Sequence, residues 1–250
     1  MPYRRLPNTD ASRIRALEII LEKDHSSEGY HSLPPMPLEQ RARFFLPRFK
    51  TAIINSHAAR EQQIAGSQKF NDYTQKSRLY ISHFLQVLNF SIIRGELKPS
   101  ARTYYGIEED NSKLPSLVSE QDLLEWGEKV IKGEQERIGM GGGTPIYNPS
   151  IALVKVNFEN FKQARFSQHQ FQVSASRFSH EVARLRNEAD EIILKLWNAI
   201  EEQTLSIADE QQRREICENF GIVYVFRKGE REKIARKKEA ERITLELPFT

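Results

Sequence analysis

The absence of glycine and proline between Ser150 and Phe220 is the feature that most constrains how this chain folds. Both residues interrupt helices, and globular helices usually run for about 8–20 residues. An uninterrupted stretch of this length therefore predicts one long helix. With Asn148 as its N-cap and Pro149 as its first residue, it would reach about residue 205 and extend roughly 85 Å.

Apolar residues recur along this stretch at heptad spacing, with an interruption at Gln168. Such spacing, sustained over several heptads, is typical of a coiled-coil-like face. The predicted apolar face consists of Val154, Phe161, Ala164, Phe171, Ala175, Phe178, Val182, Leu185, Ala189, Ile192 and Leu196.

A second long helical stretch precedes the first and resembles it at an offset of 112 residues. This predicts an internal duplication, with repeats at 37–107 and 149–222. The alternative is two unrelated helices of similar composition. The matched pairs are Pro37 with Pro149, Phe49-Lys50-x-Ala52 with Phe161-Lys162-x-Ala164, His57 with His169, Ser67 with Ser179, Ile81 with Ile193 and, after three more residues, Tyr105-Gly106-Ile107 with Phe220-Gly221-Ile222.

The earlier stretch is less regular than the later one. Pro47 should kink a helix because it removes one hydrogen bond and crowds the preceding turn. Gly66 marks a second point of weakness. Residues 37–95 could therefore form one kinked helix or a hairpin that turns at Gly66, and both alternatives remain open from the sequence.

The remaining elements are short. Thr9 or Asp10 can cap a helix that reaches about Lys23, Ser119 opens a helix that ends at Gly139, and a polar helix is expected at 208–219. Segments 223–226 and 244–247 are expected to be strands paired as a small C-terminal β-hairpin. We therefore predict a mainly α fold: one domain over 1–250, an elongated antiparallel bundle with two long duplicated helices and shorter flanking helices.

Composition limits the cellular setting. Hydrophobic residues make up 39% and charged residues 28% of the chain, and no apolar run approaches the roughly 18 residues that a membrane span requires. No apolar segment of a secretory signal follows the basic N-terminus. Cys217 is the single cysteine, so it has no internal disulfide partner. These features predict a cytoplasmic protein with no membrane partner.

The histidines do not form a recognisable metal motif. Di-metal helical bundles use Glu-x-x-His on one face of a helix, and none of His57, His83, His169 and His180 has a glutamate three residues before it. Glu22-x-x-His25 and Glu28-x-x-His31 have this spacing but reach into segment 24–36, which is rich in Ser and Pro and is expected to be a loop. His180-Glu181 does not begin a zinc-protease motif, because Arg184 occupies the position of the second histidine. His57 and His169 fall outside the apolar face. The sequence therefore predicts exposed histidines and no metal site.

Three other candidate sites, a cysteine, a carboxylate cluster and a glycine-rich loop, also lack the residues that catalysis or ligand binding would require. Cys217 has no histidine near it in sequence, and Glu188, Asp190 and Glu191 are expected on a solvated helix face. The glycine-rich loop within 139–148 lacks the Lys-Ser/Thr of a phosphate-binding loop, and no strand is expected before it. We interpret this segment as a flexible connector, and we predict no catalytic, cofactor-binding or metal-binding residue.

The C-terminal segment 227–250 is the best candidate for an electrostatic partner site. From Arg227 to Arg242 there are eight Lys or Arg and four Glu, so the local charge is 8 − 4 = +4, whereas the whole chain carries +3. The interleaved glutamates can instead pair with these cations as a solvated charged helix. The candidate nucleic-acid contacts are Arg227, Lys228, Arg231, Lys233, Arg236, Lys237 and Lys238.

Four segments resemble a family of uncharacterised bacterial all-helical proteins: residues 2–10 (PYRRLPNTD), 78–84 (RLYISHF), 152–156 (ALVKV) and 220–227 (FGIVYVFR). The similarity covers nearly the whole chain. It implies bacterial origin and a helical fold. No activity, cofactor or catalytic residue is assigned to that family, so the resemblance implies nothing about mechanism.

Three functions follow as hypotheses. The first is a non-enzymatic interaction or scaffold protein whose partner is another protein or a second copy of this chain, because long apolar faces favour association. The second is a nucleic-acid-associated protein that binds through segment 227–250. The third is a ligand-binding or enzymatic cleft between the two repeats, near the glycine-rich loop.

Overall fold

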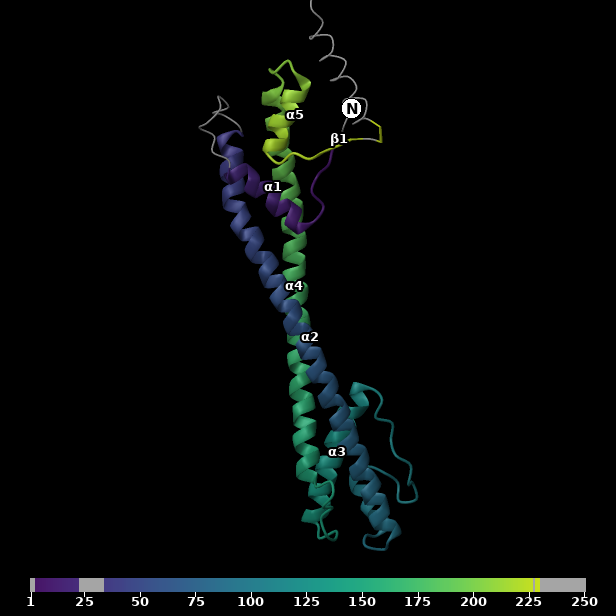
Figure 1. The fold of residues 1–250 in the computed structure, drawn as a ribbon. Coiled ribbons are helices and arrows are strands. Elements are labelled where there is room, and N and C mark those ends of the chain that lie inside the picture. The colour runs from purple at the N-terminus through teal and green to yellow at the C-terminus, as the bar shows by residue number, and fades with distance from the viewer. Residues whose placement is uncertain (1–2, 23–33, 227, 230–250) are drawn as a thin grey trace, which may run out of the picture. The chain divides into compact units, whose positions relative to one another are not determined.

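The computed structural model describes residues 3–22, 34–226 and 228–229. Over these residues, Figure 1 shows a mainly helical chain with a small two-stranded antiparallel sheet. The prediction of a mainly α fold in which two long helices pack together is confirmed. The described elements are β1 (Tyr3–Arg4), α1 (Asp10–Glu22), α2 (Met36–Ile93), the 3₁₀ helix η1 (Pro99–Tyr105), α3 (Glu120–Gly139), α4 (Ile151–Thr204), α5 (Glu210–Asn219) and β2 (Tyr224–Val225).

The chain forms two compact units. Unit 1 comprises Met1–Ser56 and Phe178–Thr250, and unit 2 comprises His57–Arg177. The N-terminal part of α2 shares unit 1 with the C-terminal part of α4, so the two helices run antiparallel. The division passes through both long helices and therefore through both predicted repeats.

Residues 36–93 form one helix, which settles the alternative that the sequence left open. Helix α2 continues through Pro47 and through Gly66. Gly66 is a close-contact position: a Cβ atom placed there would lie 2.5 Å from the Phe171 ring of α4. Glycine therefore lets the two helix backbones approach, and the tertiary contact outweighs its low helix propensity.

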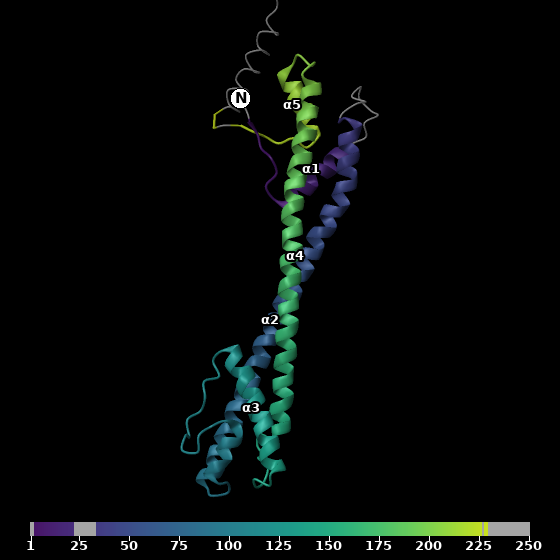
Figure 2. The same ribbon diagram turned by 180° about the vertical axis from the view of Figure 1, so that it is seen from behind.

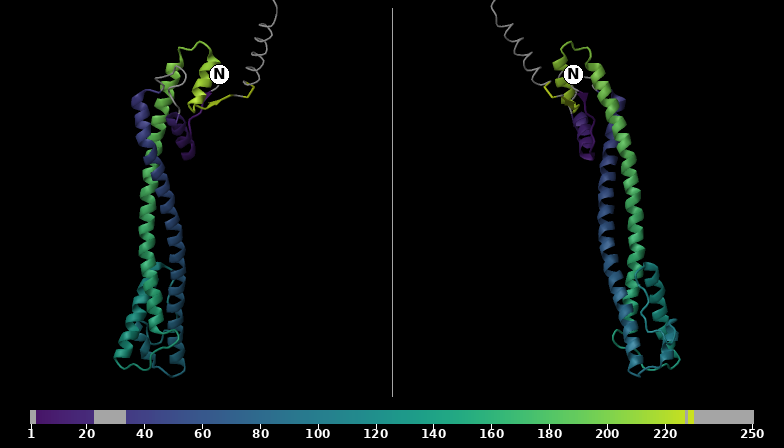
Figure 3. Two further views of the ribbon diagram at one scale, coloured as in Figure 1. Left: turned by 60° about the vertical axis from the view of Figure 1, so that its left-hand side comes forward. Right: turned by 90° about the vertical axis from the view of Figure 1, so that its right-hand side faces the viewer.

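The core of unit 1 lies where α1, α2, α4 and α5 meet, and Figure 3 shows these helices gathered around α4. Its largest fully buried side chain is Trp197 of α4. Phe45 and Phe49, one helical turn apart on α2, stack with ring centroids 5.5 Å apart. Burial of such aromatic side chains contributes roughly 1.5–3 kcal/mol each.

The core of unit 2 combines α2, η1, α3 and α4, and Figure 2 shows α3 beside the α2–α4 pair from behind. Phe70 of α2 stacks on Phe161 of α4 with ring centroids 6.0 Å apart. Phe84 of α2 meets Tyr105 of η1 edge to face. Aromatic pairs of this geometry add about 0.5–1.5 kcal/mol beyond the area that they bury.

Burial along α4 follows the predicted apolar face, but unevenly. Val154 and Phe161 are fully buried in unit 2, and the members from Val182 to Leu196 are buried in unit 1. Ala164, Phe171, Ala175 and Phe178, which lie between these groups, are only partly buried. The cores therefore concentrate where additional helices cover the α2–α4 pair.

Helix starts agree with the sequence with one exception. Ser119 and Asp122 form a capping box at α3. At the start of α1, the Ser12 N–H donates to Oγ1 of Thr9, the residue that precedes the helix. The prediction that Asn148 caps the second long helix is wrong: α4 begins at Ile151, and Ser150 Oγ accepts the Leu153 N–H at 3.4 Å. Ser150 is therefore the N-cap residue of α4, and serine is one of the residues preferred at that position.

The predicted strand at 223–226 is present as Tyr224–Val225, but its partner in the structure is Tyr3–Arg4. The register pairs Tyr3 with Val225 and Arg4 with Tyr224, antiparallel. Segment 244–247, the predicted partner strand, lies outside the described residues. The sheet therefore joins segments about 220 residues apart, a pairing that local sequence signals do not report.

The two predicted repeat ends form the same turn. Gly106 follows η1 and Gly221 follows α5, both at positive φ. The Ile107 N–H donates to the Arg102 carbonyl, and the Ile222 N–H donates to the Cys217 carbonyl, which is the same spacing. A turn with these hydrogen bonds favours glycine at the left-handed residue. The duplication itself stays a prediction.

Candidate functional sites

Unit 2 contains a fully buried ion pair within α3. Glu134 and Arg137, three residues apart, are fully buried. Glu134 accepts two hydrogen bonds from the Arg137 guanidinium, both 2.8 Å, and one from the Ile146 N–H at 3.2 Å. The Tyr105 hydroxyl also donates to Glu134. A buried pair of charges is tolerated when its remaining polar atoms are satisfied in this way.

The same arginine holds the glycine-rich loop. Arg137 donates to the Gly142 carbonyl at 2.6 Å and to the Thr144 carbonyl at 3.0 Å. The loop therefore presents carbonyl oxygens to a cation, the opposite of an anion-binding loop, whose amides would face the ligand. It connects α3 to α4 within unit 2. Because Glu134 and Arg137 have no exposed surface, this cluster is structural rather than a substrate site.

Tyr105 makes this cluster sensitive to alkaline pH. Burial, and then the hydrogen bond to Glu134, raises the pKa of Tyr105 well above its ordinary value of about 10. Above pH ~10, the Tyr105 hydroxyl therefore keeps its proton in the folded state but loses it in the unfolded state. The stabilisation is complete below pH ~10 and falls as the pH rises above it, by about 1.4 kcal/mol per pH unit.

We therefore expect the free energy of unfolding to decline above pH ~10, and to decline less steeply in Tyr105→Phe. Urea unfolding followed by circular dichroism between about pH 9 and pH 11 measures both slopes. Equal slopes in the two proteins would show that Tyr105 does not keep its proton.

Unit 1 contains a related polar cluster beside its small sheet. Glu201 of α4 accepts the Tyr224 hydroxyl at 2.7 Å and the Arg4 guanidinium at 2.8 Å. Cys217 is buried, and its Sγ lies 3.5 Å from the Thr204 hydroxyl. Burial, followed by the Glu201 hydrogen bond, raises the pKa of Tyr224. These contacts tie β1 and β2 to α4.

A cavity of about 440 Å³ lies on unit 1 between β1, α1, α4 and the turn after α5. Its polar side chains include Arg5, Arg15 and Glu218, and Trp197 contributes to its wall. Segments 5–8 and 221–223 both line it. Two of the four segments that carry the family resemblance, 2–10 and 220–227, therefore meet here, although no local sequence motif indicates this site.

A groove of about 670 Å³ lies on unit 2 where α3 begins. Glu120, Leu124 and Glu128 of α3 form one side, and α4 residues from Lys162 to Gln172 form the other. Phe166 lines the groove and is 64% exposed. Val173, seven residues further on the same face of α4, is 54% exposed.

Charge is scarce on the long helices beside this groove. Residues 166–176 of α4 and 62–68 of α2 contain no Asp, Glu, Lys or Arg. The contact between Gly66 and Phe171 places these two stretches against each other. A surface with few charged residues and exposed aromatic side chains has the composition of a protein interface.

The other sequence candidates have ordinary structural roles. His57 and His169 are exposed, as predicted, and so are His83 and His180. The part of the chain that the structure describes contains no group of His, Cys, Asp and Glu arranged to hold a metal. The carboxylates of α4 form ion pairs: Glu188 with Arg184, Asp190 with Arg13 and Glu191 with Lys195.

The nucleic-acid candidates lie almost entirely beyond the described part of the chain. Arg227, Arg231, Lys233, Arg236, Lys237 and Lys238 lie outside the described residues, and only Lys228 of this set is described, with an exposed side chain. Binding of nucleic acid through segment 227–250 therefore stays a prediction. Within residues 3–22, 34–226 and 228–229, no helix combines the length and apolar character needed to cross a bilayer.

Comparison of the chain with protein-family models, curated proteins and solved structures found no match. The resemblance to a bacterial helical family therefore stays a prediction.

Proposed function

We propose that the protein is a non-enzymatic interaction protein that self-associates through the groove on unit 2. The observation that carries the proposal is the groove at the start of α3 with Phe166 exposed beside it. Residues 166–176 continue the same helix without a charged residue. A large exposed apolar side chain beside a hollow is a typical anchor of an interface.

A second copy of the chain is the occupant that the charges favour. The α3 side of the groove carries Glu120 and Glu128, and the α4 side carries Lys162 and Arg165. Under a two-fold axis, the acidic side of one copy faces the basic side of the other, and each Phe166 enters the partner's groove. Arg165 and Glu120 form an ion pair of 3.0 Å within one copy, and both side chains are half exposed. Each can therefore also pair with the opposite charge of the second copy across the interface.

The pairing of the carboxylates in the two polar clusters supports the non-enzymatic part of the proposal. Glu134 and Arg137 satisfy each other, and no atom of either side chain reaches the surface. Glu201, in the corresponding cluster of unit 1, is occupied by Arg4 and Tyr224. A catalytic acid or base has to come within hydrogen-bond reach of a substrate proton, and these carboxylates already serve the fold.

Sedimentation equilibrium tests the proposal. A groove contact of this kind belongs to the small interfaces, at about 1,000 Å² in total, so we expect a micromolar dimer. Between roughly 1 and 100 µM, the average mass should rise from that of the 29.1 kDa chain toward twice that value. The double variant Phe166→Ser, Val173→Ser should raise the dimer dissociation constant at least about tenfold.

The chain offers a matched control for this variant. Phe90 and Val156 belong to the same unit, are 55% and 57% exposed and do not line the groove. Phe90→Ser with Val156→Ser should leave the dissociation constant unchanged. A monomer across the whole concentration range, or equal weakening by both double variants, would overturn the proposal.

A further inference from the structure

We propose that the cavity on unit 1 binds an organic carboxylate with an apolar body. The site is separate from the groove on unit 2 and does not depend on self-association. The cavity combines an apolar wall, two arginines and an indole, and four segments of the chain build it.

The size and lining of the cavity fit a small organic molecule. Its volume of about 440 Å³ lies in the range of ligand pockets, about 300–1,000 Å³. Leu6 of the N-terminal segment, Ile19 of α1 and Ile222 after α5 supply apolar surface. Such a lining binds the hydrocarbon part of a ligand by removing it from water.

The charges in the cavity select an anion. Arg5 and Arg15 line it and are exposed, and within the described residues neither side chain forms an ion pair or a hydrogen bond. Glu218 is the only acidic residue among the lining residues, so the local charge is 2 − 1 = +1. A guanidinium matches a carboxylate because its donors can bind both oxygens.

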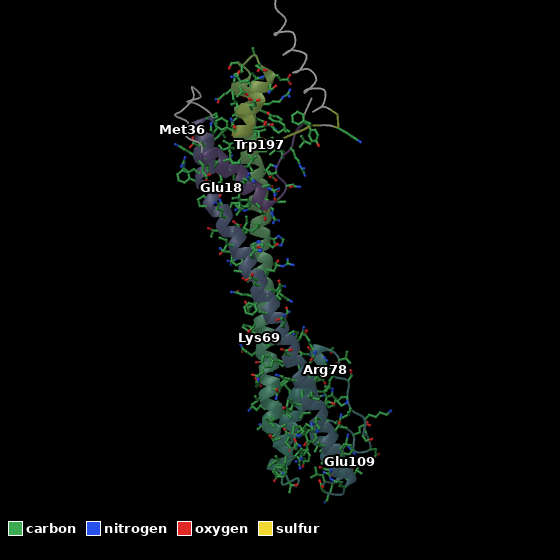
Figure 4. All side chains as sticks on the ribbon, viewed as in Figure 1. Glu18, Met36, Lys69, Arg78, Glu109 and Trp197 are labelled. Atoms are coloured by element: carbon green, nitrogen blue, oxygen red, sulfur yellow. The ribbon has the colours of Figure 1, made fainter. Side chains whose placement is uncertain are left out.

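Trp197 adds a second polar feature. Its side chain, labelled in Figure 4, is 1% exposed and forms part of the cavity wall. The indole Nε1 is buried and has no hydrogen-bond acceptor within the described part of the chain. A buried N–H without an acceptor is unfavourable by about the free energy of one hydrogen bond, and the ring itself contributes to the site as part of its wall.

The position of the cavity explains how the fold maintains it. The Arg5 N–H donates to the Val223 carbonyl at 2.8 Å, immediately after the β1–β2 pair. This hydrogen bond keeps the part of the cavity wall that contains Arg5 next to the part that contains Val223. Gly221, at positive φ, brings the chain close to Ile19 of α1. The site is therefore complete only when the sheet is formed.

A carboxylate of this type can be a free small acid or the C-terminus of an apolar peptide. Both present one carboxylate beside a hydrocarbon body, and the same residues would recognise either. The experiment therefore uses octanoate as the small acid and an apolar tetrapeptide with a free C-terminus as the peptide. Octanamide and the C-terminally amidated peptide are their neutral counterparts.

Trp197 provides the readout. The chain has two tryptophans, and Trp126 lies on α3 in unit 2. In the full chain carrying Trp126→Phe, tryptophan emission reports Trp197 alone. We expect octanoate, or the free-acid peptide, to change this emission with saturation, and we expect the matching neutral compound to bind at least about tenfold more weakly.

Arginine variants complete the test. Arg5→Gln with Arg15→Gln should weaken binding about tenfold, whereas Arg41→Gln, an exposed arginine of the same unit outside the cavity, should not change it. Saturation by only one of the two acids identifies the source of the carboxylate and supports the proposal. No saturable change with either acid, equal affinity for acid and amide, or equal effects of the two arginine variants would overturn it.

Discussion

The variant Glu134→Gln is expected to lose about 3–5 kcal/mol of unfolding free energy, because it removes the negative charge that compensates Arg137 in the core of unit 2. Both side chains are fully buried, so water cannot solvate the remaining cation. Glutamine keeps the shape of glutamate but replaces one acceptor oxygen with a donor. That amide would meet the donors of Arg137, Tyr105 and the Ile146 backbone.

Urea unfolding followed by far-UV circular dichroism measures this loss, with Glu136→Gln as the matched control. Glu136 lies on the same helix but is exposed, and its contact with Lys132 spans 3.7 Å. An exposed pair of this kind contributes about 0–1 kcal/mol. If the two variants unfold at the same urea concentration, the assignment of a buried, mutually dependent ion pair is wrong.

Gly133→Ala is expected to destabilise the protein by about 1–3 kcal/mol, although alanine is the better helix former. A Cβ atom at this position of α3 would lie 2.5 Å from the Tyr104 carbonyl oxygen and 2.7 Å from the Tyr105 ring. The first of these is a backbone atom of η1, so relief requires the two elements to separate. Tyr105 would then shift relative to Glu134.

Gly139→Ala is the control, because it makes the same substitution at the end of the same helix. Nothing lies within 4 Å of a Cβ atom placed there. The expected effect is therefore of opposite sign, a stabilisation of about 0.5–1 kcal/mol from reduced backbone entropy in the unfolded chain. Thermal unfolding of both variants measures the two changes in stability. A similar stabilisation by both would contradict the close approach of α3 to η1.

Much of the secondary structure could be predicted because its signals are local. Ser119 begins a helix because its hydroxyl accepts the backbone N–H of Asp122, only three residues further along the chain. The absence of breakers after Ser150 similarly gave α4 its length. Exposure of His57 and His169 followed from their positions outside the apolar face of a regular helix.

The candidate sites could not be predicted because their residues carry no local signal. Glu134 and Arg137, three residues apart on a helix, have the spacing of an ordinary surface ion pair. Only the covering of α3 by Tyr105 and by the loop to Ile146 makes them a buried cluster. The pairing that builds the unit 1 cavity brings together strands about 220 residues apart.

The sequence by itself therefore determined which segments are helical, where most of them begin and end, and which face of α4 is apolar, because each property depends on neighbours within a few turns. The tertiary structure alone decided that Gly66 is an interhelical contact rather than a hairpin turn, because the Phe171 ring packs there. It also decided that Phe166 and Trp197, two aromatic residues of the same helix, differ completely in exposure. The physical reason is that burial depends on how many other elements cover each turn of a long helix, and that number is set by contacts between residues far apart in the chain.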